Sequence, residues 1–157
     1  MSSKSTATSE NALTRSEIDA RLASKAGAHL ASFRADGMIH LTPIWFDWDG
    51  TSFRLTLGAG RVHLKNLAAN PRATILVDED PRTQEGLAAG AWAIECRGTA
   101  ELSEDEELIR EVTHRVLVKA LGAADADEYT GPIMAEGRTI VTITPTDWHT
   151  WDYNKVD

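Results

Sequence analysis

The sequence has one cysteine, few basic residues and no histidine cluster, and each scarcity excludes a class of protein. The single cysteine, Cys96, excludes an internal disulfide and a thiolate cluster for metal. The net charge of −8 argues against nucleic-acid and acidic-membrane partners, because both need a broad basic surface. The five histidines lack the spacing of a zinc site, so we expect no metal centre.

Two sequence signals are also missing. No stretch is apolar enough for a signal peptide or a membrane span, so we expect a cytoplasmic protein. The usual dinucleotide-binding signal is absent, because the loop at residues 58–60 has two glycines and lacks the third. Residues 1–12 are rich in Ser and Thr and predict a disordered tail, which leaves residues 13–157 as a single domain.

Apolar and polar residues alternate in six segments, which predicts six antiparallel strands. The segments are residues 28–34, 38–48, 51–57, 73–77, 91–101 and 138–144. Asp-Gly pairs at residues 36–37 and 49–50 predict tight hairpins that join the first three strands. Pro43 interrupts the second strand, and such interruptions are common where a strand lines a site.

Two capping-box patterns predict the starts of helices. Thr14 with Glu17 precedes a helical pattern over residues 16–25, and Ser103 with Glu106 precedes a longer amphipathic one. A mainly β (α+β) fold follows from this order, with one long helix inserted before the last strand. We expect a closed or nearly closed antiparallel barrel with flanking helices.

The remaining segments predict loops and a tail. Residues 78–90 are polar and contain glycine, and residues 123–131 are acidic, so both are predicted to be loops. The residues after Pro145 predict a short tail that carries Trp148 and Trp151.

The glycine loop between the third and fourth strands predicts an anion site. Its glycines allow close approach of a ligand to the backbone, and the helix that follows begins with Arg61, His63 and Lys65. Free N–H groups, a helix dipole and three potential cations converge there, so a phosphate monoester is the natural occupant. The same pattern also fits a plain glycine turn before a helix with solvated basic side chains.

Several segments, in this order, resemble the pyridoxamine 5'-phosphate oxidase-like split barrels. They are Thr-Pro-Ile-Trp-Phe at residues 42–46, Arg-x-x-x-Lys-Asn-Leu-x-x-Asn-Pro-Arg at residues 61–72, and Ile-Thr-Pro at residues 143–145. The resemblance spans about residues 15–152 and is nearest to the small actinobacterial-type oxidoreductases that use flavin or the deazaflavin coenzyme F420. It implies a six-stranded antiparallel split β-barrel of the FMN-binding type.

The resemblance also implies a homodimer with the cofactor at the subunit interface. The residues that it assigns to the cofactor phosphate are Thr56, Leu57, Arg61, His63 and Lys65. The residues that it places beside the cofactor ring are Pro43, Ile44 and Trp45. Many relatives carry lysine where this chain has His63. That departure leaves a weaker, pH-dependent donor at a phosphate-binding position, because histidine titrates near neutrality.

The activity implied by the resemblance is hydride transfer to an unidentified small organic substrate by an FMN- or F420-dependent oxidoreductase. The sequence has no convincing set of nucleophile, base and acid, so the catalytic residues stay unassigned, and the cofactor would supply the chemistry. We prefer FMN because the expected rim segments, residues 78–82 and 123–129, are mainly acidic and would repel the polyglutamate tail of F420. The family relationship favours F420. Two alternatives stay open: a non-catalytic flavin- or haem-binding split barrel, and a structural dimer whose pocket has decayed.

Overall fold

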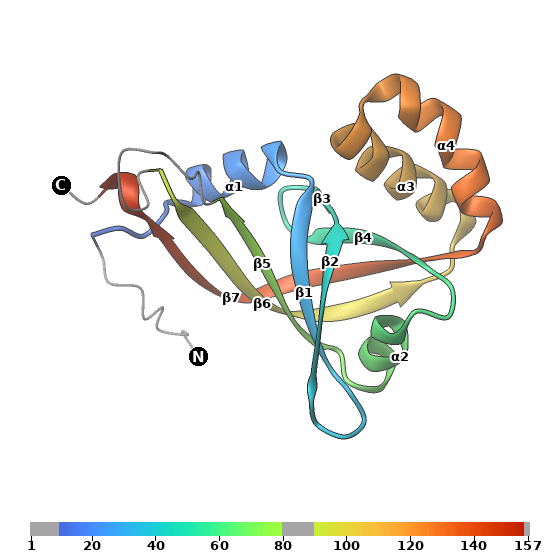
Figure 1. Cartoon of the computed structure of the whole chain (residues 1–157), viewed down its shortest axis with the longest axis horizontal. Helices are drawn as coiled ribbons and strands as arrows, with labels where there is room; N and C mark the ends of the chain where they lie inside the picture. Colours follow the sequence, from blue (N-terminus) through green and yellow to red (C-terminus); the bar gives the residue numbers. More distant parts are fainter. Residues whose placement is uncertain (1–9, 80–89, 156–157) are drawn as a thin grey trace, which may run out of the picture.

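A computed structural model describes residues 10–79 and 90–155. Four α-helices and a short 3-10 helix surround one curled antiparallel sheet (Figure 1). The elements in chain order are α1 (Arg15–Ser24), β1 (Gly27–Phe33), β2 (Ile39–Trp45), β3 (Asp47–Trp48), β4 (Phe53–Gly58), α2 (Val62–Ala69), β5 (Arg72–Glu79), β6 (Trp92–Ser103), α3 (Glu106–Leu121), α4 (Ala123–Ala135), β7 (Arg138–Asp152) and η1 (Tyr153–Lys155).

Parts of two predicted segments lie outside the described residues. They are residues 1–9 of the predicted N-terminal tail and residues 80–89 of the first predicted loop. Asp78 and Glu79, at the start of that predicted loop, are the last residues of β5. Within the described end of the predicted tail, the carbonyl of Asn11 accepts a hydrogen bond from the N–H of Asp152 at 2.9 Å.

The expected antiparallel α+β barrel with flanking helices is confirmed, but it has seven strands rather than six. The strand order is β2-β1-β5-β6-β7-β4-β3. The correction concerns the predicted second strand, which is broken at Phe46 into β2 and β3. Its first part pairs with β1, whereas its second part pairs with β4 near the opposite end of the order. The chain therefore crosses from one edge of the sheet to the other within one residue, and the sheet is a split half-barrel.

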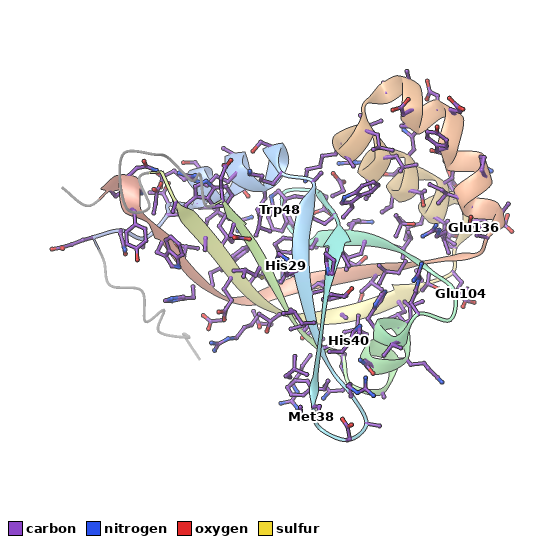
Figure 2. The ribbon with its side chains drawn as sticks, in the orientation of Figure 1. His29, Met38, His40, Trp48, Glu104 and Glu136 are labelled. Carbon is purple, nitrogen blue, oxygen red and sulfur yellow. The ribbon has the colours of Figure 1, made fainter. Side chains whose placement is uncertain are left out.

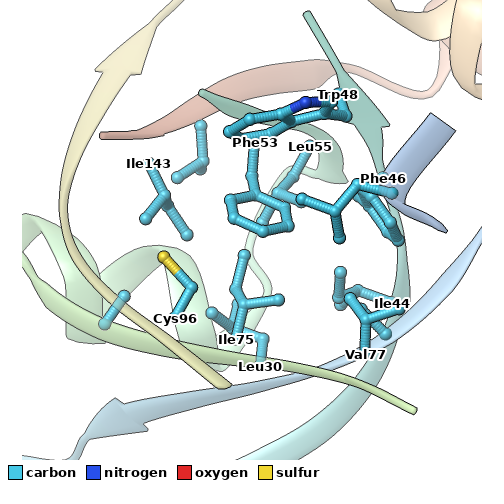
Figure 3. Close-up of a cluster of buried hydrophobic side chains, with 14 of the residues drawn as sticks. Leu30, Ile44, Phe46, Trp48, Phe53, Leu55, Ile75, Val77, Cys96 and Ile143 are labelled. Carbon is cyan, nitrogen blue, oxygen red and sulfur yellow. The ribbon is translucent and has the colours of Figure 1, made fainter. Parts of the chain in front are cut away.

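The core fills the inside of this half-barrel (Figure 3). Phe46 and Phe53 are completely buried, and their ring centroids lie 5.4 Å apart. Burial of one such side chain contributes about 1.5–3 kcal/mol. Helix α1 lies along one end of the sheet, where Leu22 is completely buried and the indole N–H of Trp48 donates to Asp19 at 2.9 Å. The apolar residues of the alternating strand patterns thus face this core.

One of the two predicted capping boxes is present. Thr14 and Glu17 form the expected reciprocal pair at the start of α1. The second prediction is wrong, because α3 is capped by Asp105, whose carboxylate accepts a hydrogen bond from the N–H of Leu108 at 2.8 Å. Ser103 is instead the last residue of β6, because that strand is longer than its alternation predicted.

The acidic segment after Gly122 was predicted to be a loop, and this prediction is wrong because residues 123–135 form α4. Alanine has the highest helix propensity of the amino acids, and it is frequent in the first turns of α4. Ala126 is completely buried and Thr130 is nearly so, and α4 packs beside α3 (Figure 1). Packing against a neighbouring helix therefore outweighs the acidic composition.

The predicted tail after Pro145 is instead the second half of β7, which runs to Asp152. Pro145 lies opposite Gly98 at a break in the register between β6 and β7, where a missing N–H is tolerated. A Cβ atom on Gly98 would lie 2.5 Å from the carbonyl oxygen of Thr144, so the close approach requires glycine. Trp148 consequently packs against the core rather than lying in a tail.

No helix in the described ranges, 10–79 and 90–155, has both the length and the apolar character that crossing a membrane requires.

The hairpin turn between β3 and β4 is organised by Asp49. Its carboxylate accepts hydrogen bonds from the N–H groups of Thr51 at 2.9 Å and Ser52 at 2.7 Å, and from Arg54 Nε at 2.8 Å. Partial burial opposes ionisation, but the hydrogen bonds from Ser52 and Thr51 outweigh it and hold the pKa of Asp49 well below its usual range.

We predict that Asp49→Ala lowers the free energy of unfolding by about 2–3 kcal/mol at neutral pH, because several charge-assisted hydrogen bonds are lost. The matched control is Asp36→Ala in the other Asp-Gly turn, where one hydrogen bond from Met38 is lost and about 1 kcal/mol is expected. The folded-state pKa of Asp49 is depressed, so its contribution is present above the ordinary value of 3.8 and is lost as the pH falls below it. Urea unfolding of both variants at several pH values measures the free energy of unfolding. A loss of stability that is equal in the two variants at all pH values would contradict the prediction.

Candidate functional site

A pocket of about 310 Å³ opens at the gap between β2 and β4, which we call the seam. Helices α3 and α4 cover one side of it, and the start of α2 closes one end. The lining residues are Thr42, Pro43, Ile44, Trp45, Thr56, Leu57, Gly58, Arg61, His63, Thr113, Val116, Leu117, Ile133 and Arg138. Wider hollows exist on the outer surface, but this seam pocket gathers the predicted site residues, so we take it as the candidate site.

Seven of the eight predicted site residues line the seam pocket. They are Pro43, Ile44, Trp45, Thr56, Leu57, Arg61 and His63. Lys65 does not join them: it is exposed and borders a separate hollow beside Arg34. Burial of Leu64 and Leu67 fixes the inner face of α2, which turns Lys65 toward solvent.

Arg138, which the sequence did not single out, also lines the pocket. It is the first residue of β7 and lies opposite Gly58 in the β4–β7 register. Its side chain is 17% exposed, and its Nε donates to the carbonyl of Ile133 at 3.2 Å. A Cβ atom on Gly58 would lie 3.6 Å from both Arg138 Nη1 and Arg61 Nε. The two guanidinium groups therefore converge beside a residue that has no side chain.

His63 is the third basic side chain of the pocket. It is buried, and its Nε2 atom has no hydrogen-bond partner among the described residues. Its ring stacks on His40 of β2, with the ring centroids 6.0 Å apart; Figure 2 shows His40 beside α2. Burial lowers the pKa of His63, and the charges of His40 and Arg61 lower it further. An unpartnered buried polar atom costs about 1–3 kcal/mol, so a ligand that bonds to it would recover that cost.

The other walls of the pocket are neutral. The hydroxyl groups of Thr56 and Thr113 lie 2.8 Å apart and join β4 to α3. Val116, Leu117 and Ile133 supply apolar surface. Trp45 is 47% exposed at the open side, where its indole can pack against a planar group.

The chemistry of this arrangement is that of an anion site beside a flat apolar surface. Two arginines and a histidine converge at one end, and no carboxylate or thiol lines the pocket in the described part of the chain. No group of three metal-ligating side chains occurs in the described residues either. The start of α2 has no side-chain cap, although the N–H of Leu64 donates to the carbonyl of Arg61 at 3.1 Å. The residues present thus fit a phosphate-bearing molecule with a planar ring.

Comparison with protein families gives a match over residues 14–152 to the family described as pyridoxamine 5'-phosphate oxidase. No curated protein matches the chain.

Solved structures show the same fold. A conserved hypothetical protein from Mycobacterium tuberculosis has a TM-score of 0.83 and 23% identity, covering 98% of this chain and 92% of that chain. The haem storage protein HutZ from Vibrio cholerae has a TM-score of 0.65 and 17% identity, covering 87% and 92%. A protein named F420 reductase has a TM-score of 0.59 and 22% identity, covering 83% and 94%. At these identities the likeness shows the fold alone.

We predict that inorganic phosphate binds at the arginine pair. Titration should shift the amide NMR signals of Gly58, Arg61 and His63 to saturation. Replacing both Arg61 and Arg138 with alanine should weaken binding by about a hundredfold or more, since charge-assisted hydrogen bonds contribute about 1.5–3 kcal/mol each.

The matched control is Lys65→Ala, which removes a cation of the same helix outside the pocket and should leave phosphate binding unchanged. Circular dichroism checks that both variants are folded. Equal loss in both variants, or no loss in the arginine variant, would show that the anion site lies elsewhere.

Proposed function

The chain belongs to the pyridoxamine 5'-phosphate oxidase family, and from that premise we propose that it is an oxidoreductase that holds a flavin-type cofactor, FMN or F420, in the seam pocket. The observation that carries the proposal is the convergence of Arg61 and Arg138 beside Gly58, together with His63, which lines the same pocket and whose buried Nε2 has no partner among the described residues. This set of donors matches a phosphate monoester.

The proposed binding mode gives the basic and the apolar residues of the pocket different parts. Arg61, Arg138 and His63 would hold the phosphate, and residues 43–45 of β2 would lie against the ring. The bound cofactor would supply hydride transfer, which no side chain of the pocket offers. The chain's part is to fix the phosphate and to keep water from the ring with the apolar surfaces of Trp45, Val116 and Leu117. The substrate is a small organic molecule at the open side of the ring.

The acidic first half of α4 supports FMN over F420. Helix α4, whose Ile133 lines the pocket, carries Asp125, Asp127 and Glu128. These carboxylates would repel the polyglutamate tail of F420, whereas FMN ends at its phosphate. The neighbour named F420 reductase supports the opposite choice. The haem storage neighbour supports a non-catalytic alternative, in which the pocket binds a ligand without turnover.

We predict that apoprotein binds FMN more tightly than riboflavin and at least as tightly as F420. Fluorescence titration of each compound measures this. F420 binding tenfold tighter than FMN would contradict the argument from the acidic helix. Binding of haem with no binding of either cofactor would contradict the oxidoreductase proposal in favour of the alternative.

The outer face of β1, β2 and β5 supports the proposal of a homodimer. Several large apolar side chains are exposed there, and Leu41 is 65% exposed. They are Met38, Ile39, Leu41, Trp45 and Leu76. Figure 2 shows Met38 at the tip of the β1–β2 hairpin. A patch of this kind is typical of an interface, and because it includes Trp45, a partner seated on it would also border the ring side of the pocket.

We predict a dimer at micromolar concentration by light scattering. Leu41→Asp should give a folded monomer, because a charge would be buried in the interface. The matched control is Val118→Asp on α3, an exposed apolar residue away from this face, which should leave the dimer intact. A wild-type chain that is only monomeric would contradict the dimer proposal.

A further inference from the structure

We propose that His63 takes up a proton when the phosphate of a ligand enters the seam pocket, so that affinity for phosphorylated ligands falls as the pH rises above neutrality. The inference rests on the proposed function, because it concerns the phosphate end of the same pocket. It assigns to His63 a part that a permanently charged lysine could not play.

The surroundings of His63 disfavour a charge while the pocket holds no anion. The ring is buried, and the charged or titratable groups that act on it are His40 from β2 and Arg61 at the start of α2. Arg138 from β7 lines the same pocket and pairs with Glu136 at 3.5 Å. Thr56 and the α3 residues of the pocket are neutral, and no carboxylate lines the described pocket. Both burial and positive neighbours lower the pKa of His63, so the imidazole is neutral near pH 7.

A bound phosphate reverses this balance. At neutral pH a phosphate monoester carries a charge near −2, which favours the charged imidazolium. A neutral imidazole has one N–H, whereas the imidazolium has two, so Nε2 can then donate to the phosphate whichever tautomer was present before. The proton comes from solvent and stays on the ring, and the previously unpartnered Nε2 gains its hydrogen bond.

The direction of the pH effect follows from linkage. The pKa of free His63 is below its ordinary value of 6.5, and the phosphate raises it in the complex. Affinity therefore falls as the pH rises between these two pKa values, by at most about tenfold per pH unit for one proton. The second pKa of a phosphate monoester is about 6, so above about pH 7 the ligand itself does not cause the fall.

Isothermal titration calorimetry with FMN tests this at about pH 7.2 in buffers of different ionisation enthalpy. Wild-type protein should take up a substantial fraction of one proton for each FMN bound. Its affinity should fall severalfold between about pH 7 and pH 8.5, as one-proton linkage requires. Riboflavin, which has no phosphate, should bind without proton uptake.

Three variants identify the group that titrates. His63→Gln should bind FMN without proton uptake and with a flat pH profile, and His63→Lys should do the same with an affinity at least that of wild type. His40→Gln should keep the uptake, because it removes only the stacked neighbour. Where His63→Gln does not fold, His63→Lys decides alone: loss of uptake supports the inference, and retention of uptake overturns it.

The outcomes separate this inference from the proposed function. FMN binding without proton uptake would overturn the inference and leave the function standing. Loss of uptake in His40→Gln together with its retention in either His63 variant would assign the proton to His40 and also overturn it. Failure of wild-type protein to bind FMN would contradict the FMN proposal itself and, with it, this inference.

Discussion

The fold depends on the single residue that joins the two edges of the sheet. Phe46 separates β2 from β3, which lie at opposite ends of the strand order. Its ring is completely buried, its N–H donates to the carbonyl of Ala26 at 3.0 Å, and Lys119 Nζ lies 3.8 Å from the ring centroid. The two sheet edges are thereby held close without pairing along the seam, and α3 packs beside the gap. The candidate site exists because the barrel is split there.

The seam explains how distant parts of the chain form one candidate anion site. Gly58 and Arg61 come from the end of β4 and the start of α2, whereas Arg138 comes from the start of β7. The β4–β7 register brings the two arginines to the same glycine. His63 completes the set because α2 turns its buried face toward the pocket. The basic character of the site is therefore local, in a chain whose net charge is −8.

Sequence reasoning succeeded where short-range signals decide the structure. The Asp-Gly turns and the Thr14 cap depend on a few neighbouring residues, and the alternation along β4 depends on one buried face. It failed where tertiary contacts decide. The break at Phe46, the helix α4 and the second half of β7 each follow from a partner that is distant in sequence. Lys65 was expected beside Arg61 because the two are close in sequence, whereas the burial of the inner face of α2 leaves Lys65 outside the seam pocket. Arg138 could be found only from the strand register, which no local motif indicates.

A crystal structure of the chain with FMN tests the central claim most directly, because it locates the phosphate. We predict the phosphate between the guanidinium groups of Arg61 and Arg138, within hydrogen-bond distance of His63 Nε2, with the ring against residues 43–45. A phosphate bound at Lys65 and Arg34, or on the outer face of the sheet beside Arg72 and Arg97, would contradict it.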